Sequence, residues 1–192
     1  MRVHRSVALG ALLSLAMGMS AQADLITGSL PLAGFGVTQT DGVDLSVSNT
    51  IETMFVLTTN AGTDDLSVIP IKVEFLDSDI FLDQADAGFG YELENLEWGK
   101  FTATSGSIVQ RTANFLDLFM EGIFTPTVDG GLKDFDATPA TVRVSINQSG
   151  SSLSQAVTLD VAPVPEPSSL ALLGIGSTVG LITVARRRWK KA

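Results

Sequence analysis

Apolar and polar residues alternate along several short stretches of the chain, and this alternation predicts β-strands. The clearest stretches are residues 43–48, 69–75, 141–146 and 157–161. Residues 51–58 are in part apolar on both faces, and Leu116, Leu118 and Met120 share one face of a further stretch. Because successive side chains of a strand point to opposite faces, each stretch is expected to bury one face and expose the other.

Turn-forming residues separate these stretches. They include Asp41-Gly42, Asn60-Ala61-Gly62, Asp129-Gly130-Gly131 and Ser149-Gly150. Residues 24–163 offer no helical stripe with capping residues. Short strands with regular turn signals predict an all-β domain, an antiparallel β-sandwich, over residues 24–163. Pro70 has no backbone N–H, so it is expected at a sheet edge or at an outward-facing ladder position.

The first 23 residues have the organisation of a secretory signal peptide. Arg2 and Arg5 give a basic start, residues 7–19 are an apolar core, and small residues flank Gln22. An apolar core of this length is too short to span a membrane stably, so we expect a signal helix over residues 1–23. Signal peptidase is then expected to cleave between Ala23 and Asp24, and the mature protein is exported.

A second apolar run lies near the C-terminus, within residues 164–192. Residues 168–185 carry no charge, and a basic tail, residues 186–191, follows directly. A spanning helix needs about 20 apolar residues, with about 17 near the lower limit. The run therefore predicts a single transmembrane helix, and the basic tail places its C-terminal end in the cytoplasm.

The segment before this run contains Pro165, Glu166 and Pro167, and the basic tail after it begins with Arg186, Arg187 and Arg188. The whole arrangement resembles the PEP-CTERM sorting signal of Gram-negative bacteria. The resemblance implies that exosortase, an integral-membrane enzyme, recognises the tail and cuts near the Pro-Glu-Pro element. A permanent single-span anchor is the alternative.

The resemblance also implies where the protein resides. The inner membrane would hold the chain transiently with its ectodomain in the periplasm, and release would deliver that ectodomain to the cell surface or the extracellular matrix. The family is associated with bacteria that produce exopolysaccharide and form biofilms, so exopolysaccharide is a further expected partner.

The amino-acid composition excludes the kinds of catalysis and metal binding that need His or Cys. The chain has no Cys, and its one His is His4, inside the predicted signal peptide. The mature protein therefore has no imidazole base, no thiol nucleophile, no disulfide and no His or Cys metal ligand. We expect that it is not an enzyme of the Ser-His-Asp or Cys-His kind.

The net charge of the exported part limits the classes of partner that we expect. All 21 acidic residues lie between Asp24 and Glu166, where only five residues are basic, a net charge of −16 for that part of the chain. A surface of this sign repels nucleic acid, so no nucleic-acid partner is expected. It can attract divalent cations weakly.

Acidic residues are densest in residues 77–86. Four of them, Asp77, Asp79, Asp83 and Asp86, are spaced so that a turning backbone could bring their carboxylates onto one hard cation. Calcium is therefore the one cofactor that the sequence suggests. The EF-hand pattern is absent, because its glycine position would be Leu82. The alternative is an acidic surface loop that binds nothing.

Glutamates precede one of the two tryptophans. A glycoside hydrolase needs two carboxylates roughly 5–10 Å apart across a cleft. Glu92, Glu94 and Glu97 offer carboxylates, and Trp98 could stack on a sugar. The alternative places Trp98, with Phe101 after it, in the core, and Tyr91 and Phe89 likewise.

The sequence thus predicts a structural or adhesive surface or matrix protein that is not catalytic. A carbohydrate- or calcium-binding module is the alternative, and a carboxylate-based glycoside hydrolase is the third and weakest hypothesis.

Overall fold

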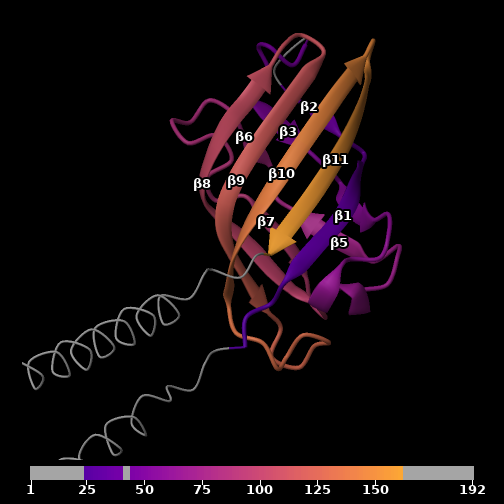
Figure 1. Cartoon of the computed structure of the whole chain (residues 1–192). Helices are drawn as coiled ribbons and strands as arrows, with labels where there is room; N and C mark the ends of the chain where they lie inside the picture. Colours follow the sequence, from indigo (N-terminus) through magenta and orange to yellow (C-terminus); the bar gives the residue numbers. More distant parts are fainter. Residues whose placement is uncertain (1–23, 41–43, 162–192) are drawn as a thin grey trace, which may run out of the picture.

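The computed structural model describes residues 24–40 and 44–161, and eight of their strands close into an antiparallel barrel (Figure 1). The barrel strands are β1 (Gly28–Phe35), β4 (Phe55–Thr58), β5 (Glu74–Asp77), β7 (Glu92–Asn95), β8 (Gly99–Arg111), β9 (Phe115–Pro126), β10 (Thr138–Ser149) and β11 (Ser152–Val161). Closure falls on β1, which pairs with β11 on one side and with β4 on the other. Antiparallel neighbours need only short turns, which suits the turn-rich sequence.

Two smaller elements accompany the barrel. A second sheet has the order β2 (Thr38–Gln39), β3 (Thr50–Glu52) and β6 (Ile80–Phe81). A short 3₁₀ helix, η1 (Asp64–Val68), lies between β4 and β5.

Alternation places the core inside the barrel. Leu116, Leu118 and Met120 are fully buried on the inner face of β9, as the sequence predicts. Val142 and Val144 do the same on β10, whose register pairs Val142 with Met120 and Val144 with Leu118. Burial of such side chains is the main stabilising term, at about 25 cal/mol per Å² of apolar surface.

The all-β antiparallel prediction is confirmed, but the sandwich is corrected to a closed barrel. A sandwich would leave each of its two sheets with free edges, whereas here β1 joins both ends of one continuous sheet. Alternating side chains are the same in both architectures, so the pattern did not distinguish them.

Residues 44–48 form a turn instead of the predicted strand. The Asp44 carboxylate accepts hydrogen bonds from the backbone N–H and the hydroxyl of Ser46, 2.9 and 2.5 Å away. An aspartate that bonds its own backbone two residues on stabilises a turn at the expense of a strand.

Two further predicted strands are shorter or broken. Ile69 ends η1, Lys72 has a φ of 64°, and the strand β5 begins only at Glu74, so Pro70 lies in a connection and not in a strand. The stretch 51–58 divides into β3 and β4, and Met54 between them is 71% exposed.

Both chain ends leave the same end of the barrel. Gly28 at the start of β1 pairs with Val161 at the finish of β11 (Figure 1). We call this the terminal end; the connections 59–73, 96–98 and 127–137 lie there too. The opposite, far end carries the β8–β9 turn, residues 112–114, and the β10–β11 turn at Gly150.

Within residues 24–40 and 44–161, no helix has the length and apolar character needed to cross a membrane. The predicted signal helix, residues 1–23, and the predicted transmembrane helix, residues 168–185, lie outside the described residues.

Candidate functional site

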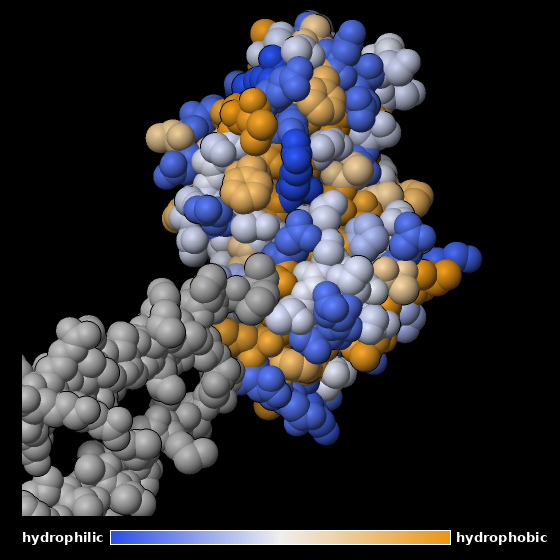
Figure 2. Space-filling view, in the orientation of Figure 1, coloured by the Kyte–Doolittle hydropathy of each residue, from blue (hydrophilic) through white to orange (hydrophobic). Residues whose placement is uncertain are grey.

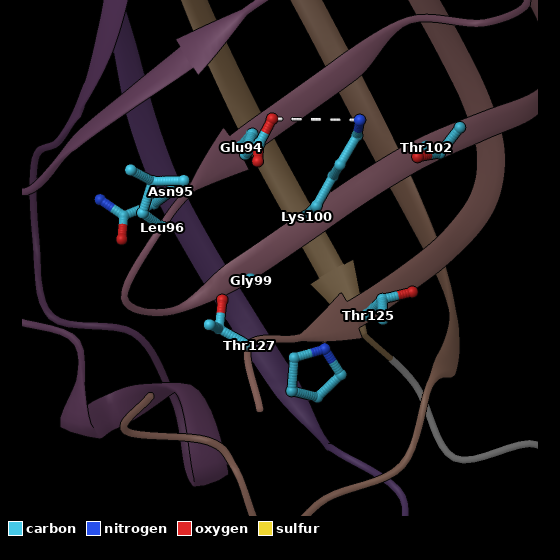
Figure 3. A pocket seen from close by; sticks show the side chains of 9 residues that line it. Glu94, Asn95, Leu96, Gly99, Lys100, Thr102, Thr125 and Thr127 are labelled. Carbon is cyan, nitrogen blue, oxygen red and sulfur yellow. Dashed lines mark ion pairs between the residues drawn. The ribbon is translucent and has the colours of Figure 1, made fainter. Parts of the chain in front are cut away.

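An open pocket of about 410 Å³ lies on the barrel wall near the terminal end, over β7, β8 and β9 (Figure 3). Its lining combines hydroxyl, amide and charged side chains with one exposed leucine. The lining residues are Glu94, Asn95, Leu96, Gly99, Lys100, Thr102, Thr125, Pro126 and Thr127. Such a set can hydrogen-bond a polar ligand from several directions.

Lys100 is the charged centre of this pocket. Its ammonium nitrogen lies 2.7 Å from a Glu92 carboxylate oxygen and 3.9 Å from one of Glu94. The hydrogen bond to Glu92, followed by the charges of both glutamates, raises the pKa of Lys100 above its usual value. The pocket therefore presents a cation that is paired with carboxylates, and one of these carboxylates, that of Glu94, lines the pocket itself.

Glu92 and Glu94 lie two residues apart on β7, and both carboxylates lie beside Lys100. Both side chains are 43% exposed. The structure therefore brings the two predicted carboxylates together in one cluster with Lys100. Glu97 lies in the β7–β8 turn, where its backbone N–H donates to Asn95 Oδ1.

Trp98 and Tyr91 are core residues and not a sugar-stacking surface. Their exposed fractions are 8% and 1%. Trp98 packs so closely on Gly131 that a Cβ there would meet the indole at 2.1 Å. The alternative that placed these aromatic residues in the core is confirmed for Trp98, Tyr91 and Phe101, and it is wrong for Phe89, which is 53% exposed.

The predicted calcium site is not assembled. Asp79, Asp83 and Asp86 are exposed, whereas the Asp77 oxygens are buried. Among the described residues, no group of three or more His, Cys, Asp or Glu side chains could hold a metal ion. The reason is strand geometry: β5 ends at Asp77 and β6 intervenes at Ile80–Phe81, so the segment is not a single turning loop.

Asp77 instead belongs to a polar cluster inside the barrel. On β5 the side chains alternate, so Phe75 and Asp77 face inward while Leu76 is 61% exposed. Burial raises the pKa of Asp77 to about 7, against the smaller opposing effect of the nearby Thr53 and Tyr91 hydroxyls. Those hydroxyls are close, but neither is placed to complete a hydrogen bond, and both Asp77 oxygens lack a partner.

The same cluster extends to β11. Gln155 is 5% exposed, and its Oε1 accepts a hydrogen bond of 2.6 Å from the Thr53 hydroxyl. Gly34 on β1 leaves room for it, because a Cβ there would meet Gln155 Oε1 at 2.4 Å. Burial and the neighbouring Asp77 raise the pKa of Tyr91 well above its usual value. Sequence reasoning missed this cluster, because an acidic segment predicts exposure.

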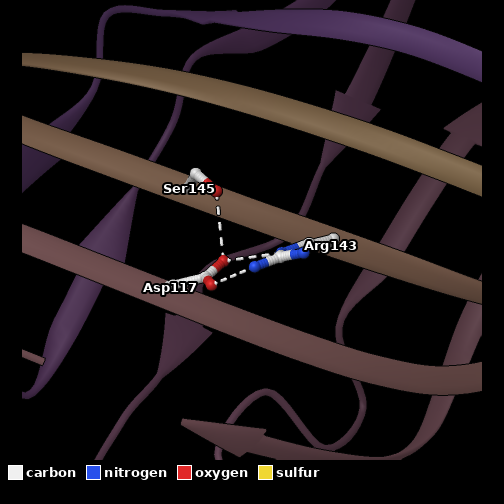
Figure 4. A network of polar contacts seen from close by, with 3 residues as sticks. All are labelled: Asp117, Arg143 and Ser145. Carbon is white, nitrogen blue, oxygen red and sulfur yellow. Dashed lines mark hydrogen bonds and ion pairs between the residues drawn. The ribbon is translucent and has the colours of Figure 1, made fainter. Parts of the chain in front are cut away.

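A second polar network crosses β9 and β10 (Figure 4). Asp117 is 3% exposed; it accepts hydrogen bonds from Arg143 Nε at 3.0 Å, Arg143 Nη2 at 2.6 Å and Ser145 Oγ at 3.1 Å. The Arg143 hydrogen bond, ahead of Ser145, holds the pKa of Asp117 below its usual value. A two-pronged contact of this kind is among the stronger polar interactions. The network joins two neighbouring strands, because Asp117 lies on β9 while Arg143 and Ser145 lie on β10.

The remaining predicted site residues fall outside the described part of the chain. They are Ala23 at the predicted signal-peptidase site, and Pro165, Glu166, Pro167, Arg186, Arg187 and Arg188 of the sorting segment. Asp24, on the other side of the predicted cleavage, is described; its carbonyl oxygen accepts from the Asp136 N–H at 3.0 Å.

These features define a closed acidic barrel with an open pocket whose lining is both polar and apolar. Residues 163–188 match the PEP-CTERM protein-sorting motif. The motif supports an exported protein that is sorted by exosortase, and it implies transfer to the cell surface by way of the membrane. No curated protein and no solved structure matches the chain.

Proposed function

We propose that the barrel is a structural or adhesive module that works at the cell surface or in the extracellular matrix. The observation that carries this proposal is the PEP-CTERM motif, which begins at residue 163, two residues beyond the last barrel residue, Val161. The barrel is thus the cargo that the motif delivers. Its net charge of −16, counted from Asp24 to Glu166, suits a soluble surface component.

In this proposal residues 168–185 hold the chain in the inner membrane while the barrel lies in the periplasm. Exosortase then cuts near Pro165-Glu166-Pro167, and the barrel is released. The absence of Cys and of a mature His supports a role that is not catalytic.

The test is intact mass of the protein in the membrane and secreted fractions of a host with and without exosortase. We expect a product lacking residues 1–23 and the segment after the Pro-Glu-Pro element, and only when exosortase is present. Pro165→Ala with Pro167→Ala should retain the full tail in the membrane, whereas Pro163→Ala, just outside the element, should be processed. A tail that persists in every strain would establish a permanent anchor instead.

A second candidate function is recognition of a polar polymer such as exopolysaccharide at the Lys100 pocket. Its support is the lining, which includes three threonine hydroxyls and Lys100, whereas the Asn95 amide is bonded to the backbone of Glu74, Glu97 and Trp98 (Figure 3). Titration calorimetry with the host polysaccharide tests it. The double variant Thr125→Ala with Thr127→Ala should bind the polysaccharide more weakly than the parent protein. The control variant Thr112→Ala, at the far end, should bind it as the parent does. Equal binding by the parent, the double variant and the control would exclude the pocket.

A further inference from the structure

Four exposed aliphatic side chains gather at the terminal end of the barrel. Val68 and Ile71, in the connection 59–73, are 54% and 55% exposed. Leu96, in the connection 96–98, is 82% exposed, and Val128, in the connection 127–137, is 84% exposed. Single exposed aliphatic residues are ordinary on protein surfaces, but these occupy the tips of three different connections on one end.

The connections that carry them are tied to the chain and to one another. Thr27 donates from its backbone N–H and its hydroxyl to Asp65, at 2.8 and 2.9 Å, which fixes η1 beside the start of β1. Gly130 packs on the Glu97 carbonyl so closely that no Cβ would fit. The Asp136 N–H donates to the Asp24 carbonyl. The aliphatic tips therefore project from an ordered layer.

That layer has its own apolar contacts beneath it. Each of its connections inserts at least one buried side chain into the core; these are Leu66, Ile69, Trp98 and Leu132. The same connections therefore carry both buried side chains, which face the core, and the exposed aliphatic side chains, which face outward. Figure 2 shows hydrophobic residues at the surface in both halves of the molecule, including the lower part near the place where the chain ends leave.

The chain itself determines what this end can face. From Val161 to Ser168, where the uncharged run begins, there are seven residue steps. A fully extended chain covers about 3.5 Å per step, so the run begins within about 25 Å of the barrel. If the run lies in a bilayer, as the proposed function requires, the terminal end faces the lipid surface at close range.

We propose that the terminal end is a bilayer-contact surface, with Val68, Ile71, Leu96 and Val128 entering the headgroup region while the chain is anchored. This inference rests on the anchoring step of the proposed function. Lys72 and Lys133 lie in the same connections and are exposed, so their stems can lie along the interface with the charge in water. Asp64, Glu97, Asp129, Asp134 and Asp136 also lie there and are exposed, so the fitting surface is zwitterionic lipid and not anionic lipid.

The test uses the absence of cysteine in the chain, which lets one introduced thiol carry one fluorescent label. Val68→Cys and Val128→Cys place the label at the terminal end. Val47→Cys and Val109→Cys, at 55% and 57% exposure, place it toward the far end as matched controls. The full chain, purified from a host that lacks exosortase, is reconstituted into phosphatidylcholine vesicles containing nitroxide-headgroup lipid.

We expect the terminal labels to be quenched about threefold more than the far-end labels. Flotation of the vesicles reports separately whether the chain is anchored. Flotation with equal quenching at all four positions would overturn the contact surface and leave anchoring in place. Failure to float would overturn both. Self-quenching of terminal labels in vesicles without nitroxide would show that a second copy covers this end, which also overturns the proposal.

Discussion

At the scale of single residues, the buried carboxyl of Asp77 is the most unusual group in the barrel. Both of its oxygens are buried without a hydrogen-bond partner, as is the Tyr91 hydroxyl. A carboxylate in this setting is costly, because burial penalises the charge and no cation lies against it. The raised pKa, about 7, means that the Asp77 carboxyl stays protonated and uncharged in the folded protein below about pH 7.

Asp77 should make the barrel less stable as the pH rises from about 4 to 7. Its pKa is about 7 in the folded state and near 3.8 when unfolded, so the folded state binds the extra proton between these values. Asp77→Asn removes this dependence and should raise the free energy of unfolding at pH 8 by between about 2 and 4 kcal/mol, less where solvent screens the charge.

Urea unfolding at pH 5 and pH 8 measures this difference. Asp79→Asn is the matched control, since Asp79 is an exposed aspartate two residues away. If the two variants respond to pH alike, Asp77 is not the titrating group.

At the scale of elements, the contact between β9 and β10 depends on a buried carboxylate that a surface arginine covers. The Asp117 side chain is 5% exposed and that of Arg143 is 58% exposed. Removing the arginine leaves a buried charge with one hydroxyl partner, whereas removing Asp117 leaves a cation that water can solvate. The two deletions are therefore unequal.

Arg143→Met should lower the free energy of unfolding at pH 7, because it leaves the Asp117 carboxylate with one hydroxyl partner. The low pKa of Asp117 means that the pair stabilises the fold above about pH 4 and that this stabilisation is lost as the pH falls below it. The difference between the variant and the parent should therefore shrink at pH 3 in urea titrations. Ser145→Ala, the control, should cost less, because it leaves both Arg143 hydrogen bonds to Asp117 in place. Equal costs at pH 7 would show that the arginine is not the main partner of Asp117.

At the scale of the whole molecule, closure of the barrel joins every strand to two neighbours. The pairs β1–β11 and β1–β4 are the closing contacts, and they connect segments more than 120 and about 25 residues apart in sequence. With no sheet edge free in the barrel, opening at one place weakens the hydrogen-bond ladders on both sides. The barrel should behave as one cooperative unit.

We expect a single two-state unfolding transition. In a Trp189→Phe variant the fluorescence comes from Trp98 alone, near the terminal end, while circular dichroism reports all strands. The two signals should give the same urea midpoint. Midpoints that differ beyond error would show that the terminal end unfolds separately from the rest.

The alternation of apolar and polar residues was enough to predict many of the strands. The buried face of β9 was predicted because Leu116, Leu118 and Met120 alternate with polar or outward residues, and alternation is decided within one strand. Residues 44–48 alternate equally well, yet the Asp44 side chain bonds to Ser46 and makes a turn. Propensity and periodicity do not weigh a side-chain hydrogen bond against strand pairing, so this prediction was wrong.

The candidate sites were harder to predict, because their residues meet only through pairing of distant segments. Thr53 and Gln155 are 102 positions apart and share a hydrogen bond inside the barrel. Asp77 looks like its exposed neighbours in composition, and only its place on the inner face of β5 sets it apart. The glutamates beside Lys100 were recognised, but their shared environment was not.

The sequence by itself determined the sorting motif, the strand-forming character and the chemical inventory, because each depends on residues that are adjacent or on simple counts. Pro165-Glu166-Pro167, the basic tail and the missing cysteines need no folding to be recognised. Only the tertiary structure decided that the sheet closes on β1, that Asp77 faces inward, and that both chain ends leave beside the aliphatic tips. The physical reason is that closure and burial arise from contacts between segments that are far apart in sequence, which period-two alternation does not encode.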